Sequence, residues 1–121
     1  MIVAFAGETF FKELIEQAAE AEGKDCLVVA DEETLQAVLQ EATPGAIFME
    51  VGVLGQDASD LIQKLRQNQA TRRIPLVAFG NSLRADLLQD AKEAGADLVL
   101  PKSAFREQLP ELLRHYDPRH P

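Results

Sequence analysis

Two charged residues stand where apolar stretches of the sequence end, and they are the strongest candidates for chemistry. Glu50 lies in the apolar run 46–51 (AIFMEV), and Lys102 follows the run 97–100 (DLVL) and Pro101. A carboxylate at the end of a buried strand is costly unless it is paired or hydrated. If the two strands are neighbours, the Lys102 ammonium can offset the desolvation of the Glu50 carboxylate. Such a pair is either a charged functional site or an ion pair with a purely structural role.

A second candidate is the segment of Gly80, Asn81 and Ser82, which follows another apolar run. Amides at a helix start could bind a small anion there, together with Lys102. The alternative is a plain loop in which Ser82 caps the next helix. The sequence has no glycine-rich phosphate loop and no cluster at metal-ligand spacing. It pairs no nucleophile with a base, so we expect no metal site, no cofactor, no catalytic residue and no enzymatic turnover.

Five short apolar runs alternate with five amphipathic segments along the chain. The apolar runs predict strands over 2–6, 26–30, 46–51, 74–79 and 97–100. Apolar residues at three- and four-residue spacing predict helices over about 8–22, 31–42, 58–69, 83–94 and 105–116. Gly23 and Gly95 are placed to end helices, and Asp31 is placed to cap one. Pro110 falls inside the last helix and is expected to kink it or delay its start.

Continuous apolar strands are typical of a parallel sheet that helices cover on both faces. Right-handed crossovers between such strands give a doubly wound α/β domain of the flavodoxin-like class. We expect a single domain over residues 1–116 and a polar tail, or the start of a linker, over 117–121. Ligands of such sheets bind at the carboxyl ends of the strands, which is where Glu50 and Lys102 lie.

The net charge of −8 is unevenly distributed along the chain. Residues 1–60 carry 13 acidic and two basic residues, whereas residues 61–121 carry seven acidic and ten basic residues. A chain this acidic is expected to bind neither nucleic acid nor an anionic membrane, because both are polyanions. No apolar stretch reaches the roughly 20 residues that span a bilayer. The single cysteine, Cys26, reads as a small buried hydrophobe, and we expect a reducing, cytoplasmic location.

The chain resembles the receiver domain of two-component response regulators. The resemblance rests on the fivefold strand–helix repeat and on the segments GAIFMEVGVLGQDASDLIQKLR, IPLVAFGN and EAGADLVLPKSAF. The most specific piece is GAD followed, five residues later, by Lys102. The resemblance covers about residues 1–116 and implies a five-stranded parallel sheet in the order 2-1-3-4-5. It also implies a role in signalling through protein partners.

Most of the family's phosphorylation site is not matched. The resemblance places the acidic pair that holds Mg²⁺ at Ala6 and Gly7, and neither has a side-chain oxygen to offer the ion. The next residue, Glu8, starts a helix and is a weak substitute. The phosphoacceptor Asp falls at Glu50, where the extra methylene displaces the carboxylate from the arrangement for in-line attack. Only the site lysine is kept, as Lys102.

Two further family positions differ in this sequence. The Thr or Ser that contacts the phosphoryl group falls at Gly80, and the aromatic switch residue falls at Val99. Phosphoryl transfer depends on metal neutralisation and positioning, so we expect a degenerate, phosphorylation-independent receiver. Glu50 then either imitates a phosphorylated Asp or simply satisfies Lys102. The alternatives are an active phosphoacceptor regulator with an atypical site and a small-anion-binding flavodoxin-like domain.

Receivers commonly contact partners through their fourth helix, fifth strand and fifth helix. In this sequence the resemblance implies a partner face that comprises Arg84, Leu87, Lys92, Val99, Arg106 and Leu109. Exposed apolar residues among these would mark a contact. The uneven charge also leads us to expect a weak homodimer, with the acidic half of one copy against the other half of its partner.

Overall fold

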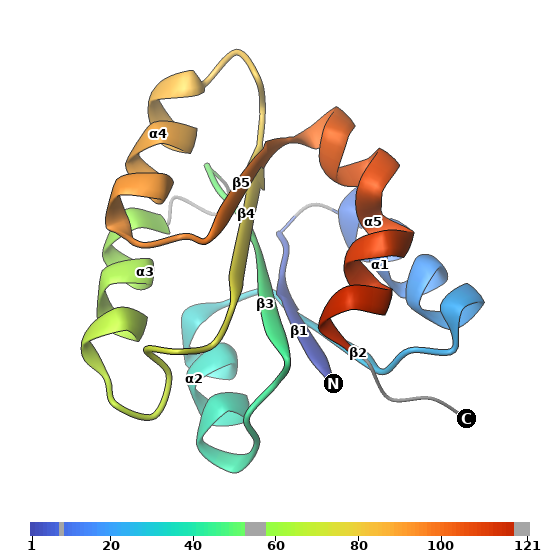
Figure 1. Cartoon of the computed structure of the whole chain (residues 1–121), viewed down its shortest axis with the longest axis horizontal. Helices are drawn as coiled ribbons and strands as arrows, with labels where there is room; N and C mark the ends of the chain where they lie inside the picture. Colours follow the sequence, from blue (N-terminus) through green and yellow to red (C-terminus); the bar gives the residue numbers. More distant parts are fainter. Residues whose placement is uncertain (8, 53–57, 118–121) are drawn as a thin grey trace.

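The apolar runs form one parallel sheet in the computed structural model, which describes residues 1–7, 9–52 and 58–117 (Figure 1). The strands are β1 (Ile2–Phe5), β2 (Cys26–Val29), β3 (Ala46–Glu50), β4 (Leu76–Gly80) and β5 (Leu98–Pro101). All neighbouring strands are parallel, and their order is β2-β1-β3-β4-β5. The predicted fold class and strand order are therefore confirmed.

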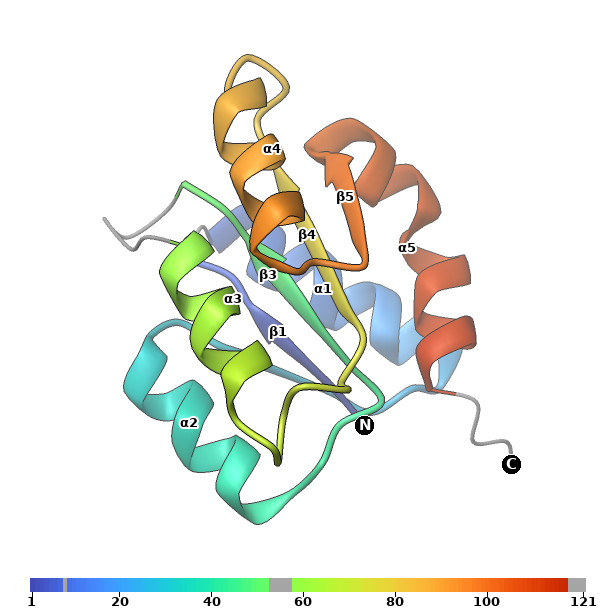
Figure 2. The same cartoon turned by 60° about the vertical axis from the view of Figure 1, so that its left-hand side comes forward.

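Five helices alternate with the strands and cover both faces of the sheet (Figures 1 and 2). They are α1 (Thr9–Glu22), α2 (Glu32–Glu41), α3 (Ala58–Gln67), α4 (Ala85–Ala94) and α5 (Lys102–Tyr116). Helices α1 and α5 pack on one face, and α2, α3 and α4 pack on the other. Each face thus buries its own apolar layer, which explains why the strands are apolar without alternation.

The helix ends mostly follow the predicted signals. Gly23 and Gly95 end α1 and α4 with φ of +66° and +128°, which glycine adopts without strain. Asp31 caps α2, where its Oδ1 accepts a hydrogen bond of 2.7 Å from the Thr34 amide. This bond from Thr34 holds the pKa of the Asp31 carboxyl below its usual value.

Two helix starts differ from the predictions. Helix α4 begins at Ala85, and its N-cap is Arg84 rather than Ser82. The reason is a turn before the helix, in which Asn81 Oδ1 accepts a hydrogen bond from the Leu83 amide. Helix α5 begins at Lys102, three residues earlier than predicted.

Helix α5 also continues through Pro110 to its end at Tyr116. The missing N–H of Pro110 removes the helical partner of the Arg106 carbonyl, and Arg106 lies at the solvent-exposed surface. Pro101 precedes the helix in an extended conformation, with φ of −64° and ψ of 156°. Lys102 is therefore the first residue of a helix and not part of a loop.

A half-buried arginine, Arg66, fastens the amino-terminal end of the sheet, opposite the end where Glu50 and Lys102 lie. Arg66 of α3 donates hydrogen bonds to the carbonyls of Gly95 (3.0 Å), Arg72 (3.1 Å) and Ile74 (2.8 Å). It also donates to Asp97 Oδ2 at 2.9 Å. The GAD segment therefore has a structural role at Gly95 and Asp97, because the Arg66 side chain occupies the space that a Cβ at Gly95 would need.

Replacing Arg66 with Ala should lower the free energy of unfolding by about 2 kcal/mol, because it removes the side-chain donor of three carbonyls and leaves the Asp97 carboxylate with only the Leu76 amide as a donor among the described residues. Urea denaturation followed by circular dichroism measures this loss. Arg114→Ala is the matched control, since Arg114 is half-exposed and makes one ion pair, with Glu22 at 2.9 Å. That variant should change stability by less than about 0.5 kcal/mol. Equal losses in the two variants would contradict the role assigned to Arg66.

Asp117 belongs to the folded domain and not to the polar tail, contrary to the predicted boundary. It is 2% exposed, and its Oδ2 accepts a hydrogen bond of 3.2 Å from the Asp25 amide. Its Oδ1 lies 3.3 Å from the amino group of Met1. A carboxylate so buried is stabilised by such donors. The rest of the predicted tail, 118–121, lies outside the described residues.

Cys26 is half-buried on the edge strand β2. Burial, reinforced by the negative charge of Asp25, raises the pKa of its thiol to about 12. The thiol therefore stays protonated at neutral pH and packs as a small hydrophobe, as predicted. Within the described residues, no helix combines the length and the apolar character that crossing a membrane requires.

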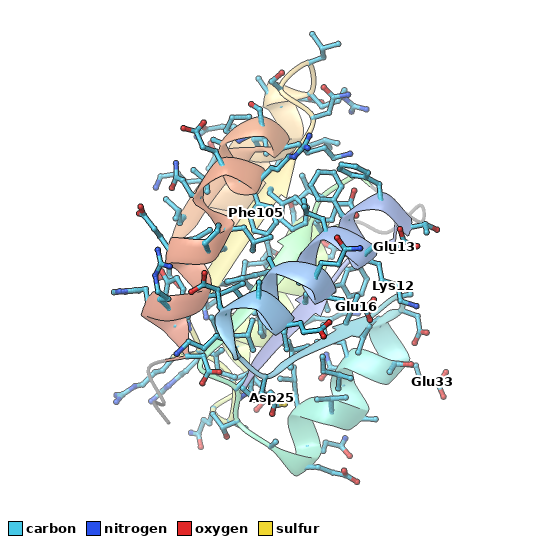
Figure 3. All side chains as sticks on the ribbon, turned by 90° about the vertical axis from the view of Figure 1, so that its right-hand side faces the viewer. Lys12, Glu13, Glu16, Asp25, Glu33 and Phe105 are labelled. Atoms are coloured by element: carbon cyan, nitrogen blue, oxygen red, sulfur yellow. The ribbon has the colours of Figure 1, made fainter. Side chains whose placement is uncertain are left out.

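The strand order separates the two halves of the sequence in space. Strands β2 and β1 lie at one side of the sheet, and β4 and β5 lie at the other. The acidic first half therefore gathers around α1, β2 and α2, where the labelled residues Glu13, Glu16, Asp25 and Glu33 point to solvent (Figure 3). Most of the acidic excess is thus a property of this surface.

Candidate functional site

Glu50 ends β3 and is fully buried at the carboxyl edge of the sheet. Its Oε2 lies 3.3 Å from Lys102 Nζ, so the predicted ion pair is confirmed. The strands that lead to the two residues are not neighbours, because β4 lies between β3 and β5. Lys102 reaches the carboxylate because it opens α5, and α5 packs on the face of the sheet to which Glu50 belongs.

The second partner of the Glu50 carboxylate comes from the end of β1. The amide of Gly7 donates a hydrogen bond of 3.1 Å to Glu50 Oε1. Ala6 is buried and, like Gly7, contributes no side-chain oxygen. Glu50 thus bridges the end of β1 and the start of α5. The extra methylene of Glu over Asp lengthens the side chain that spans this gap.

Aromatic rings support the lysine side of the pair. The Lys102 ammonium lies 5.2 Å from the centre of the Phe11 ring, within the range of a cation–π interaction. Phe11 packs against Phe79 with ring centres 5.2 Å apart, and Phe79 stacks on Phe105 at 3.8 Å. The Lys102 side chain is 27% exposed, so part of it still meets water. The Glu50–Lys102 ion pair is therefore packed against buried aromatic rings on one side and remains partly exposed to water at Lys102.

The last position of β4, Gly80, has no room for a hydroxyl-bearing side chain. A Cβ built at Gly80 would lie 2.5 Å from Val51 Cγ2 and 3.3 Å from Leu88 Cδ2. Real Cβ atoms do not approach another carbon to 2.5 Å. Val51, the residue after Glu50, thus fills the space beside Gly80 with apolar atoms. The absence of Thr or Ser at position 80 is matched by the packing around it.

Polar groups of the loop after β4 form hydrogen bonds with the backbone of the same loop. Asn81 Oδ1 accepts the amide of Leu83, and the Asn81 carbonyl accepts the amide of Arg84 at 2.9 Å. Arg84 also pairs with Asp86 at 3.1 Å, and this hydrogen bond holds the pKa of the Asp86 carboxyl below its usual range. The loop has the geometry of a capped turn.

The expected partner face is only partly at the surface. Arg84 and Lys92 are exposed, and Leu87 and Val99 are half-buried against the apolar layer of α2, α3 and α4. Leu109 is wrong for such a face, because it is 1% exposed and lies in the layer under α1 and α5.

Arg106, also expected on the partner face, is exposed on α5. Its guanidinium lies 5.5 Å from the centre of the Phe10 ring of α1. It therefore stands on the side of α5 that faces α1. A helical period places residues 100° apart, so a shift of one or two positions along α5 moves a side chain to another face.

The described residues contain no group of three or more His, Cys, Asp and Glu side chains that could hold a metal ion. Glu8, considered above as a substitute ligand, lies outside the described residues, as do residues 53–57 of the loop after β3. Three participants of the site were not predicted from the sequence: the Gly7 amide as a donor, Phe11 under the lysine, and Val51 beside Gly80. Of these, only Val51 had a signal, because it extends the apolar run past Glu50.

No protein-family model matches the sequence, and no curated protein is similar to it in sequence. Solved structures are similar in fold. The receiver domain of a sensor histidine kinase from Pseudomonas aeruginosa superposes with a TM-score of 0.81 and 20% identity, over 95% of this chain and 94% of that one. The chemotaxis response regulator CheY4 of Vibrio cholerae gives 0.80 and 17%, over 95% and 96%.

A third similar structure is the signal receiver domain of a signal transduction histidine kinase from Syntrophus aciditrophicus. It gives a TM-score of 0.81 and 18% identity, over 95% of this chain and 87% of that one. The Pseudomonas domain was solved with a magnesium ion coordinated in its active-site cleft. At these identities the similarity shows the fold, and the fold of this chain is that of receiver domains.

Proposed function

We propose that this chain, which has the receiver fold, is a signalling module that works without phosphorylation, through contact with a protein partner. The observation that carries the proposal is the placement of Glu50. Its buried carboxylate already has an amide donor from Gly7 and an ammonium from Lys102. An incoming phosphoryl group or metal ion would have to displace these contacts.

The chemistry of phosphoryl transfer supports the same proposal. The reaction needs a metal ion and donors that neutralise the charge on the transferred group. Mg²⁺ takes hard oxygen ligands in a near-octahedral array. Ala6 and Gly7 supply no side-chain oxygen, and Val51 fills the space beside Gly80. We therefore assign the chain no enzymatic turnover and no cofactor.

We assign Glu50 the role of a structural tie rather than that of a phosphoaspartate mimic. A carboxylate carries one negative charge, whereas a phosphoryl group carries about −1.5 to −2 and offers three acceptor oxygens. Val99 supplies no ring that could report such a charge, and Gly80 supplies no hydroxyl. The carboxylate instead joins β1, β3 and α5. A site whose contacts do not change suits a module that signals through its surface. We also propose a cytoplasmic location, because the single cysteine stays protonated and a reducing compartment keeps it so.

Acetyl phosphate with Mg²⁺ should leave the ¹⁵N-labelled chain unchanged. We expect no saturable amide shifts at residues 6, 7, 50–52, 80 and 102, and no gain of a phosphoryl group in the intact mass. An active receiver domain treated in the same way serves as the positive control. Shifts at these residues that saturate only when Mg²⁺ is present, or a phosphorylated mass, would show an active phosphoacceptor and refute the proposal.

A further inference from the structure

Strand β2 forms one side of the sheet, and in the part of the chain that the structure describes its only neighbouring strand is β1. The carbonyl of Asp25 accepts a hydrogen bond of 2.9 Å from the amide of Ile2. The carbonyl of Val29 accepts one of 3.0 Å from the amide of Ala6. Backbone groups of alternate residues in a strand point to the same side, so those of Leu27 face β1 as well.

The residues in between, Cys26 and Val28, therefore turn their N–H and C=O groups away from the sheet. We call these outward groups the β2 edge. An edge strand of this kind is a template for pairing with another extended chain. The strand reads CLVV, so neither a charged side chain nor a proline protects the edge over its four residues.

The two faces of β2 differ in how well their side chains are covered. Cys26 and Val28 pack in the apolar layer under α1 and α5. Leu27 points to the other face, where Val29 is buried, yet Leu27 itself is 43% exposed. Side chains on neighbouring strands of a sheet cover one another. A further strand with an apolar side chain on that face would therefore cover Leu27.

Acidic side chains surround the β2 edge. Those labelled in Figure 3 are Glu13, Glu16, Asp25 and Glu33. Residues 12–33, which run from α1 to the first turn of α2, carry eight acidic residues and two lysines. Burial is the main cause of the raised pKa of the Cys26 thiol, and the negative charges of Asp25 and Glu16 add to it. The charge of Glu16 on α1 is therefore felt at the strand itself.

The opposite side of the sheet ends in β5, and its surroundings are different. Residues 84–106, which run from the start of α4 to the second turn of α5, carry four acidic and four basic residues. A positively charged strand is therefore attracted to the β2 edge and not to β5. A negatively charged strand is repelled from the β2 edge for the same reason.

From these observations we infer that the β2 edge binds an extended, basic segment of a partner protein, which adds a sixth strand to the sheet. The backbone of the segment pairs with Cys26 and Val28, and an apolar side chain covers Leu27. Lysine or arginine side chains on its other face lie toward Glu16. A second copy of this chain is a poor occupant, because pairing β2 with β2 brings two acidic surfaces together. The inference rests on the proposed function, since it names the chemistry of the partner.

The test is an NMR titration of the ¹⁵N-labelled chain with two synthetic peptides of eight residues. In one, valine alternates with lysine, and in the other glutamate replaces each lysine. The basic peptide should shift the amides of residues 25–29 in a saturable way and leave those of residues 98–100 in β5 unchanged. The acidic peptide should shift neither set.

Hydrogen exchange tests the pairing of the backbone directly. In the chain alone, the amides of Cys26 and Val28 should exchange faster than those of Leu27 and Val29, which face β1. A saturating amount of the basic peptide should slow the exchange of Cys26 and Val28 at least tenfold. The exchange of Leu27 and Val29 should change much less, because their amides are already paired.

Two variants remove the proposed contacts one at a time. Glu16→Lys should weaken binding of the basic peptide by about tenfold, because an attraction becomes a repulsion. Val28→Pro removes an outward N–H and no bond to β1, a place where an edge strand tolerates proline. It should also weaken binding about tenfold, and circular dichroism checks that it is folded. Glu93→Lys is the matched control, since it makes the same charge change at an exposed position of α4 and should bind within about twofold.

Four results of these measurements would overturn the inference. They are equal binding of the acidic peptide, equal shifts in β2 and β5, unslowed exchange of Cys26 and Val28, and an equal loss in Glu93→Lys. If Val28→Pro does not fold, Glu16→Lys and the exchange rates still decide.

Sedimentation of the chain alone supplies the remaining outcome. A dimer that Val28→Pro dissociates would mean that a second copy pairs with the β2 edge, and it would overturn the assignment to a basic partner segment. Failure here is separable from failure of the proposed function, because the phosphorylation test reads the mass of the chain and residues at the other site. A chain that accepted a phosphoryl group would still bind the basic peptide if the β2 edge is a docking site.

Discussion

Replacing Lys102 with Met should lower the free energy of unfolding by about 3 kcal/mol, the lower end of the range for breaking a buried ion pair. The variant keeps an unbranched side chain over Phe11 but removes the cation that lies 3.3 Å from Glu50 Oε2. The carboxylate is fully buried and would keep the Gly7 amide but lose this ammonium. We take the lower end because Lys102 itself is 27% exposed. Urea denaturation measures the loss.

The matched variant is Lys102→Met combined with Glu50→Gln. Gln removes the buried charge and keeps an oxygen that can accept the Gly7 amide. The double variant should therefore recover more than half of the stability that Lys102→Met loses, giving a coupling energy of about 1.5 kcal/mol or more between the two sites. Loss of an exposed ion pair typically lowers the free energy of unfolding by less than about 1 kcal/mol. If Lys102→Met lowers it by under about 0.5 kcal/mol, Lys102 does not hold Glu50, and the structural role assigned to Glu50 is wrong.

Placing a hydroxyl-bearing residue at Gly80, the last residue of β4, should also be costly. Gly80→Thr places a Cβ 2.5 Å from Val51 Cγ2, and the two methyl-bearing groups have to move apart. Overpacking of this kind destabilises by about 1–3 kcal/mol, and we expect the upper end because a β-branched side chain enters a fully buried strand. The variant should unfold at a lower urea concentration, with an unchanged dependence of the free energy on urea.

Val51→Ala gives the decisive control. Alone, it should destabilise the chain by about 1–2 kcal/mol through lost apolar contacts and a small cavity. In the Gly80→Thr background it should cost much less, because it removes the carbon that the new Cβ meets. Strictly additive losses would show that Val51 does not occupy the space of the missing hydroxyl, and the packing argument for a lost phosphoryl contact would fall.

The architecture was accessible from the sequence because its signals are local. Apolar runs of about five residues predict the strands, and apolar residues at helical spacing between them predict the helices. Only a few topologies can connect these elements. The pairing of Glu50 with Lys102 was accessible for a related reason. Both residues had to lie at the carboxyl edge of the sheet, and a buried carboxylate needs a cation.

Other parts of the site depend on contacts between distant residues and had no such signal. Whether position 80 can hold a side chain depends on where Val51 points, and the sequence does not give that direction. The direction of a helical side chain depends on the helix phase, which is why Leu109 was wrongly predicted to lie on an exposed face. Arg66 bonds mainly to carbonyl groups, and backbone acceptors leave no trace in residue types. Asp117 was predicted to belong to the tail because its partners, the Asp25 amide and the Met1 amino group, are far away in sequence.

The strand order has an electrical consequence for how this molecule meets others. With β2 and β1 at one side and β4 and β5 at the other, the uneven sequence becomes a dipole that lies across the sheet. Its field extends about 10 Å into solution at 0.1 M salt, so an approaching charged protein is oriented electrostatically before it contacts this chain. Association rates should therefore depend on ionic strength more than the lifetimes of the complexes do. A chain with the same composition and evenly spread acids would collide in random orientations.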